Sequence, residues 1–158
     1  MAEILSLKAD IEYTFPLDRY YLIDDNGHSW AKHSKGKNYL VGLDAFGAVI
    51  AGDILHVRAR KVGTIVKQFK ALGTVESNKW IGPILQPFSG TITAFNEKLH
   101  ENPKLIHADP YNQGWIVEIE INEDTFRLEK EHELISSIGS REKLEKFIKT
   151  EFERFELL

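Results

Sequence analysis

Residues 72–92 read LGTVESNKWIGPILQPFSGTI, and this stretch is the most informative one about the fold. Strand-forming residues stand on both sides of Ser77-Asn78-Lys79, which predicts a β-hairpin with Lys79 at its tip. A lysine at such a tip is normally a solvated charge. A hairpin tip is also the place where the active site of another protein can reach a side chain most easily. The stretch therefore leaves two interpretations open, a soluble turn or an amine presented for modification.

From about residue 20 to residue 121, short strand-like segments alternate with turn residues. Asn26-Gly27 predicts a tight type I′ turn between two aromatic segments. Gly-Thr-Ile occurs at residues 63–65 and again at residues 90–92, which indicates either two similar halves or a coincidence. So many short strands at nearly regular spacing predict an all-β sandwich or barrel.

Two segments have helical patterns instead. Asp44 is placed to cap a short helix. Near the C-terminus, Ser140 is the expected N-cap of an amphipathic helix with balanced charges. The apolar face of this helix would be formed by Leu144, Phe147, Ile148, Phe152 and Phe155. We expect the C-terminal helix, and a shorter one before it, to pack on the sheet, the alternative being a helix that docks a partner.

The composition describes an ordinary globular chain. It has 158 residues, 42% hydrophobic content and a net charge of −4, which gives no long-range attraction to nucleic acid or to an anionic membrane. No apolar run approaches the roughly 20 residues of a membrane span. The start has neither the basic region nor the apolar run of a signal peptide. We therefore expect a single cytoplasmic domain that binds no nucleic acid and no membrane.

Side chains that could form a catalytic centre or a metal site are not arranged in any recognisable motif. There is no cysteine, and the six histidines lack the spacing of metal ligands on one element. Glycine-rich phosphate-binding loops and nucleophile elbows are also absent from the sequence. We expect no catalytic residue and no metal, so a metabolic role would depend on something that the protein carries.

Several stretches resemble the H protein of the glycine cleavage system, a lipoyl carrier. The most specific one is ENPKLIHADPYNQGWIVEIEI, residues 101–121, which is similar to the NP-L-DPY-GW pattern of that family. The other matching stretches are VGLDAFGAVIAGDILHV, VGTIV, GTVESNK and PFSGTITAFNEKL. The match as a whole, from about residue 20 to residue 121, covers about two-thirds of the chain.

The resemblance implies a fold and a site. The fold would be mainly β, a barrel-sandwich hybrid of two small sheets with C-terminal helices. Residues 1–19 would be an extension, residues 20–121 the lipoyl-binding domain and residues 122–158 a helical segment packed on it. Lys79 would be the lipoyl-lysine, with lipoic acid attached through an amide. The residues expected to form the lipoylation motif or face the arm are Glu76, Ser77, Asn78 and Trp80.

The chain also departs from the usual family pattern. H proteins usually read ESVKAASDLYSPVSG where this chain reads ESNKWIGPILQPFSG, so Trp80 replaces a small residue and Gly82-Pro83 replace a polar pair. Both this stretch and residues 15–32 are more similar to the H-like lipoate-binding proteins of the heterodisulfide-reductase-like sulfur-oxidation system. Trp80 has a large apolar face that either covers the arm or packs across the hairpin.

The resemblance implies a non-catalytic carrier with a set of partner enzymes. A lipoylating enzyme would load it, and a heterodisulfide-reductase-like complex would exchange a sulfur intermediate with it. The alternative is a genuine glycine cleavage H protein that carries an aminomethyl group between glycine decarboxylase and aminomethyltransferase, with dihydrolipoamide dehydrogenase as the electron acceptor. A further alternative is an H-like binding module without a cofactor.

Overall fold

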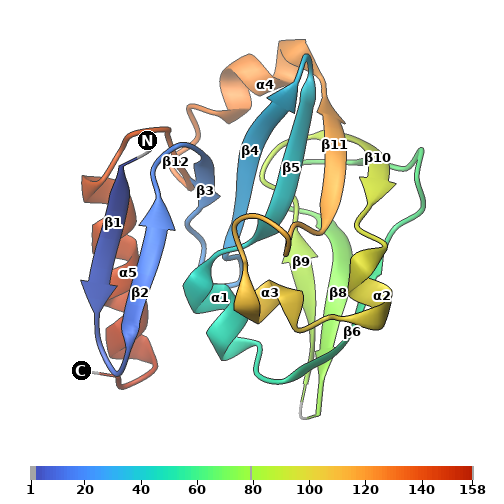
Figure 1. Cartoon of the computed structure of the whole chain (residues 1–158). Helices are drawn as coiled ribbons and strands as arrows, with labels where there is room; N and C mark the ends of the chain where they lie inside the picture. Colours follow the sequence, from blue (N-terminus) through green and yellow to red (C-terminus); the bar gives the residue numbers. More distant parts are fainter. Residues whose placement is uncertain (1–2, 79, 158) are drawn as a thin grey trace.

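The segments predicted as strands form antiparallel ladders in a computed structural model that describes residues 3–78 and 80–157 (Figure 1). The strands are β1 (Ile4–Lys8), β2 (Glu12–Pro16), β3 (Tyr20–Leu22), β4 (Ser29–Lys35), β5 (Asn38–Leu43), β6 (Ile54–Ala59), β7 (Ile65–Val66), β8 (Ala71–Ser77), β9 (Ile81–Leu85), β10 (Gly90–Phe95), β11 (Val117–Ile121) and β12 (Ile135–Ser136). The helices are α1 (Ala45–Ile50), α2 (Lys98–Glu101), α3 (Leu105–Ala108), α4 (Glu123–Glu129) and α5 (Glu142–Arg154).

Two of the sheets enclose the main core. The larger sheet has the strand order β12-β3-β4-β5-β11-β10-β7, and the smaller one has the order β6-β8-β9. Alternate residues of both sheets point inward, among them Val41 and Ile119 from the large sheet and Val57, Val75 and Ile84 from the small one. The mainly β prediction is therefore confirmed, with one curled sheet larger than expected and a separate two-stranded sheet, β1-β2.

The two Gly-Thr-Ile copies lie side by side. Thr91 of β10 pairs with Ile65 of β7 in an antiparallel register. The backbone N–H of Ile92 donates to the carbonyl of Thr64 at 2.9 Å. This pairing is the arrangement expected of two related halves that meet along one edge.

A tight turn does join β3 to β4, but the predicted type I′ geometry is wrong. The N–H of Gly27 donates to the carbonyl of Asp24 at 2.8 Å, so Asp25 and Asn26 are the central residues. Neither Asn26 nor Gly27 has the positive φ that a type I′ turn there requires. The glycine serves a close approach instead, because a Cβ at Gly27 would lie 2.8 Å from the side chain of Leu22.

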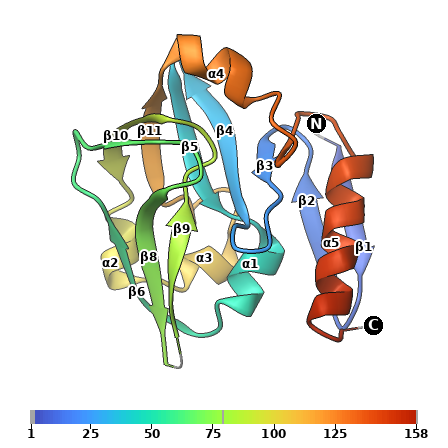
Figure 2. The same ribbon diagram turned by 180° about the vertical axis from the view of Figure 1, so that it is seen from behind.

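A second core lies between α5 and the β1-β2 hairpin, which Figures 1 and 2 show running alongside each other at one end of the molecule. Leu144, Ile148 and Phe152 of α5 are fully buried there. The ring of Phe152 lies 5.4 Å from that of Tyr13 and 5.6 Å from that of Phe46 in α1. The N-terminal extension and the C-terminal helix thus share one core, and we retain the division at residues 19/20 and 121/122 as a proposal.

The helix signals were partly right. Asp44 caps α1 by accepting from the N–H of Gly47 at 2.7 Å, as predicted. Ser140 does not cap α5, because the N-cap position is occupied by Arg141, whose side chain makes no capping hydrogen bond. The helix begins at Glu142 with acidic residues in its first turn, where they interact favourably with the helix dipole.

The segment before α5 also holds a strand that the sequence did not predict. The expected shorter helix is α4, and β12 follows it as an edge strand on β3. None of the helices among the described residues is long and apolar enough to cross a membrane.

Replacing Phe152 by Ala should lower the free energy of unfolding by about 3–5 kcal/mol, because it leaves a cavity between Tyr13 and Phe46. Urea unfolding followed by circular dichroism measures this. Leu128→Ala is the matched control, since Leu128 is 76% exposed and a change there should stay within about 0.5 kcal/mol. Equal midpoints for the two variants would contradict the second core.

Candidate functional site

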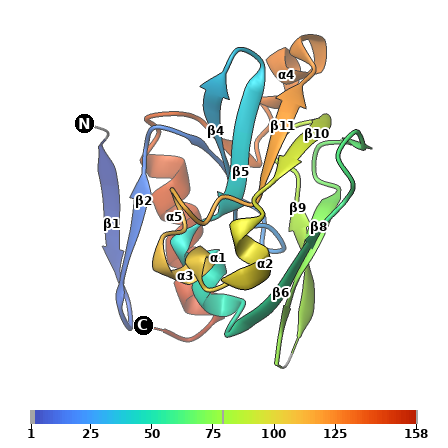
Figure 3. The same cartoon turned by 45° about the vertical axis from the view of Figure 1, so that its right-hand side comes forward.

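The β8-β9 hairpin projects beyond the rest of the molecule (Figures 1 and 3). Its register pairs Glu76 with Ile81 and Val75 with Gly82. The N–H of Ser77 donates to the carbonyl of Trp80 at 2.8 Å. Among the described residues, this is the backbone hydrogen bond across the hairpin that lies nearest to position 79. The predicted hairpin is therefore confirmed, and it brings the two sides of position 79 together.

Lys79 itself lies outside the described residues. Asn78 before it and Trp80 after it are both exposed, whereas Glu76 and Ser77 are half-buried. The hydroxyl of Ser77 also donates to the Trp80 carbonyl at 3.4 Å. The structure thus gathers Glu76, Ser77, Asn78 and Trp80 around this position, and their roles in lipoylation remain predictions.

Trp80 packs on its own hairpin and also remains accessible. A Cβ on Gly82 would lie 1.8 Å from the indole ring, so the ring occupies the space that any side chain at position 82 would need. The residue is still 49% exposed. The ring therefore lies over Gly82 on its own side of the hairpin and also lines a cavity, and its contact with the arm stays a prediction.

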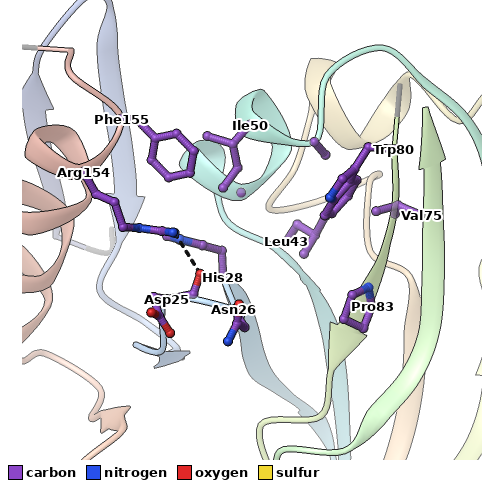
Figure 4. Close-up of a pocket in the computed structure, with 12 residues that line it drawn as sticks. Asp25, Asn26, His28, Leu43, Ile50, Val75, Trp80, Pro83, Arg154 and Phe155 are labelled. Atoms are coloured by element: carbon purple, nitrogen blue, oxygen red, sulfur yellow. Dashed lines mark hydrogen bonds between the residues drawn. The ribbon is translucent and has the colours of Figure 1, made fainter. Parts of the chain in front are cut away.

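This cavity has a volume of about 300 Å³ and lies between the hairpin, α1 and the end of α5 (Figure 4). Its apolar lining is formed by Leu43, Ile50, Ala51, Val75, Trp80, Pro83 and Phe155. Its polar lining is formed by Asp25, Asn26, His28 and Arg154. Figure 4 shows Arg154 and Phe155 on one side and Trp80 and Pro83 on the opposite side.

A buried charge cluster adjoins the cavity, and two of its members, His28 and Arg154, line it. His28 Nε2 lies 2.7 Å from Glu151 Oε1, and His28 Nδ1 lies 3.3 Å from Asp44 Oδ2. Arg154 donates from Nε to Glu151 Oε2 at 2.7 Å and from Nη2 to the Asp25 carbonyl at 2.9 Å. The cluster thus joins the β3-β4 turn, the cap of α1 and the last turn of α5.

Charge pairing decides the protonation states in this cluster. Burial alone would lower the pKa of His28, but the carboxylates of Asp44 and Glu151 more than offset it and raise this pKa from 6.5 to about 9. Burial would raise the pKa of Glu151, and the hydrogen bonds from His28 and Arg154 lower it. His28 is therefore a cation at neutral pH, held between two carboxylates.

The sequence analysis noted only that the charges of this helix balance, and it missed the roles of Glu151 and Arg154. A signal for Glu151 was present, because it stands seven residues after Leu144 and three after Ile148, on the apolar stripe of the helix. A charged residue on a buried stripe needs a partner, and the partner is His28. Arg154 had no such signal, since its place at the cavity depends on how α5 is packed.

No cluster of three or more histidine, cysteine, aspartate or glutamate side chains that could hold a metal ion occurs within residues 3–78 and 80–157. The site in this part of the chain is thus an exposed hairpin beside a largely apolar cavity with one charged wall.

Comparisons with known proteins identify the family of this chain. The family model described as "Glycine cleavage H-protein" matches residues 19–151. The chain belongs to the glycine cleavage H-protein family. H proteins are carrier subunits and not catalysts, and the family works with glycine decarboxylase, aminomethyltransferase and lipoamide dehydrogenase.

Two curated H proteins illustrate the relationship. "Glycine cleavage system H protein 5" of Aquifex aeolicus is 43% identical over 106 residues, which cover 66% of this chain and 71% of that protein. "Probable glycine cleavage system H protein 2" of Sulfurisphaera tokodaii is 33% identical over 136 residues, which cover 86% of this chain and 89% of that protein.

A solved H protein has the same fold. The crystal structure of a glycine cleavage system H protein from Mycobacterium marinum superposes with a TM-score of 0.64 at 22% identity, covering 87% of this chain and 98% of that one. The chain is thus an H-type lipoyl carrier in family and in fold.

The pairing of His28 makes a prediction about stability and pH. Because its folded pKa is raised above the unfolded value of 6.5, the stabilisation is complete below about pH 6.5 and is lost as the pH rises to about 9. The urea midpoint of the wild type should fall over this range, and that of His28→Gln should fall much less.

His56→Gln is the control, since His56 is exposed on β6. It should retain the pH dependence of the wild type. A midpoint of the wild type that stays constant from pH 6 to pH 9.5 would contradict the ion pairs.

Proposed function

We propose that this chain is a swinging-arm carrier with lipoate joined through an amide to the side chain of Lys79. The observation that carries the proposal is a projecting hairpin in an H-family chain, with exposed residues on both sides of position 79. An arm anchored at such a position can reach partner enzymes while the domain stays folded. When bound, lipoate supplies the redox and group-transfer chemistry through its dithiolane, and the protein supplies position, shelter and recognition.

The residues beside the hairpin fit such an arm. The apolar lining from Ile50, Val75, Trp80 and Pro83 suits an alkyl chain and a ring of low polarity. These side chains exclude water from one side of the cavity, which protects a reactive cargo from hydrolysis. The volume of about 300 Å³ is at the lower end of the range for small-molecule sites.

We further propose that the cargo is a sulfur intermediate passed to or from a heterodisulfide-reductase-like complex. The departures from the usual H-protein pattern at positions 80 and 82 support this, because they are physically coupled. The Trp80 ring fills the space above Gly82, so the tryptophan and the glycine form one remodelled surface next to the arm. A changed surface at this place indicates a changed cargo.

The alternative cargo is the aminomethyl group of glycine cleavage, with glycine decarboxylase, aminomethyltransferase and dihydrolipoamide dehydrogenase as partners. Membership of the glycine cleavage H-protein family favours it. In either case a lipoylating enzyme must load the arm.

Coexpression with a lipoylating enzyme tests the attachment. Lys79→Arg should abolish the lipoyl adduct in intact-mass analysis, because a guanidinium does not form the amide although the charge is kept. Lys61→Arg, at another exposed lysine, should be loaded like the wild type. A wild-type chain without any adduct would favour a binding module without a cofactor.

An exchange assay tests the cargo. Loaded protein should fail to support glycine decarboxylation by a decarboxylase from a glycine-cleaving organism, because its arm surface differs from that of the usual H protein. A glycine-branch H protein loaded in the same way is the positive control. Turnover equal to that of the control would overturn the sulfur assignment and leave the carrier role intact.

A further inference from the structure

Arg154 gives the cavity beside Trp80 a cationic wall. Its side chain is 44% exposed and is held by Glu151 and by the Asp25 carbonyl. The ring of Phe155, 4.5 Å from the guanidinium carbon, supports its position. These bonds use Nε and Nη2, and among the described residues no hydrogen bond is formed by Nη1. Two fixed N–H donors are therefore available to a ligand.

The carboxylates that balance this wall are shielded from the cavity. Asp44 and Glu151 are each 1% exposed, and neither lines the cavity. They lie behind His28 and Arg154, which do line it. A group in the cavity therefore contacts His28 and Arg154 and does not reach Asp44 or Glu151.

Asp25 is the remaining acidic group at the cavity. Its neighbour Asp24 has a raised pKa, first because of burial and second because of a hydrogen bond with the Asp25 carboxyl group. The Asp25 carboxylate also interacts electrostatically with Arg154, so it belongs to the same charged wall. Asn26, also at the rim, is uncharged, so the Arg154 guanidinium is the charged group best placed to bind a ligand.

We propose that Arg154 is a specificity-determining residue that binds the negatively charged end of the cargo while the arm lies along Trp80. The class of cargo is a sulfur oxyanion, whose oxygens accept from the planar fork of a guanidinium in charge-assisted hydrogen bonds. An ammonium group such as that of an aminomethyl cargo has no acceptor for these N–H donors. This inference rests on the proposed carrier function and names the cargo class for that same site.

The first test uses unlipoylated protein, so that it does not depend on the arm. Trp80 fluorescence is obtained by subtracting the signal of Trp80→Phe and is quenched with iodide, caesium or acrylamide at constant ionic strength. Iodide quenching should fall about two-fold in Arg154→Gln, because the local anion concentration follows the surface potential. Acrylamide quenching should not change.

Two variants control for the helix and for the charge. Lys149→Gln makes the same charge change on an exposed part of α5 and should leave iodide quenching unaltered. Arg154→Lys keeps the charge and should retain most of the iodide quenching of the wild type. Thermal unfolding of each variant checks that α5 stays in place. Equal iodide quenching in Arg154→Gln and the wild type, or stronger quenching by caesium than by iodide, would overturn the proposal.

The second test uses lipoylated protein and sulfite as the anionic probe. Sulfite attacks one sulfur of a disulfide, so a bond to the sulfite sulfur forms, the original S–S bond breaks and the other sulfur leaves as a thiolate, without any further oxidant. The adduct fraction from intact-mass analysis at equilibrium should fall several-fold in Arg154→Gln and stay unchanged in Lys149→Gln.

An unchanged adduct fraction in Arg154→Gln would reject the cargo assignment even if iodide quenching had fallen. A wild-type protein that never gains a lipoyl group would instead reject the proposed function. In that case the quenching experiment still decides whether the wall binds anions, so the two failures are distinguishable.

Discussion

The placement of His28 between Asp44 and Glu151 is the interaction on which the site depends. Three charged side chains are buried together, and burial of such groups is tolerated only when they are paired and hydrogen-bonded. The pairing constrains three distant parts of the chain at once. Asp44 also caps α1, and Glu151 also holds Arg154. One charge cluster therefore sets the positions of α1 and α5, which form two walls of the cavity.

The third wall depends on a steric constraint. In the β8-β9 hairpin the Trp80 ring lies where a side chain at position 82 would be, so only glycine permits this placement of the indole. The pair stands in a regular hairpin whose register joins Glu76 to Ile81 and Val75 to Gly82. The tryptophan thus reshapes the surface beside position 79 while the β ladder is kept.

The protein chain supplies structure and surface rather than a reactive thiol or a metal-binding cluster among its described residues. Among the described residues there is no metal-binding cluster, and the chain as a whole has no cysteine. Without cysteine, the chain has no thiol of its own to exchange with a dithiolane. Its contribution is a rigid β core, a projecting hairpin, an apolar shelter and a charged wall. The C-terminal helix is part of this site because its last residue, Arg154, and its C-cap residue, Phe155, line the cavity.

The sequence by itself determined the strand-rich region from about residue 20 to residue 121, the hairpin around position 79 and the family, because alternating strand residues, turn residues and the NP-L-DPY-GW pattern are local signals. It did not predict β1, β2 or β12. Tertiary structure alone decided the rest. The turn before β4 is centred on Asp25 and Asn26, and Gly27 follows it. A glycine is needed there because a Cβ would collide with the side chain of Leu22. Arg154 faces the cavity because the packing of Phe152 against Tyr13 and Phe46 and the pairing of Glu151 with His28 hold α5 in place. Contacts between segments more than 100 residues apart have no local signature, so the charged wall of the site emerges only when the chain has folded.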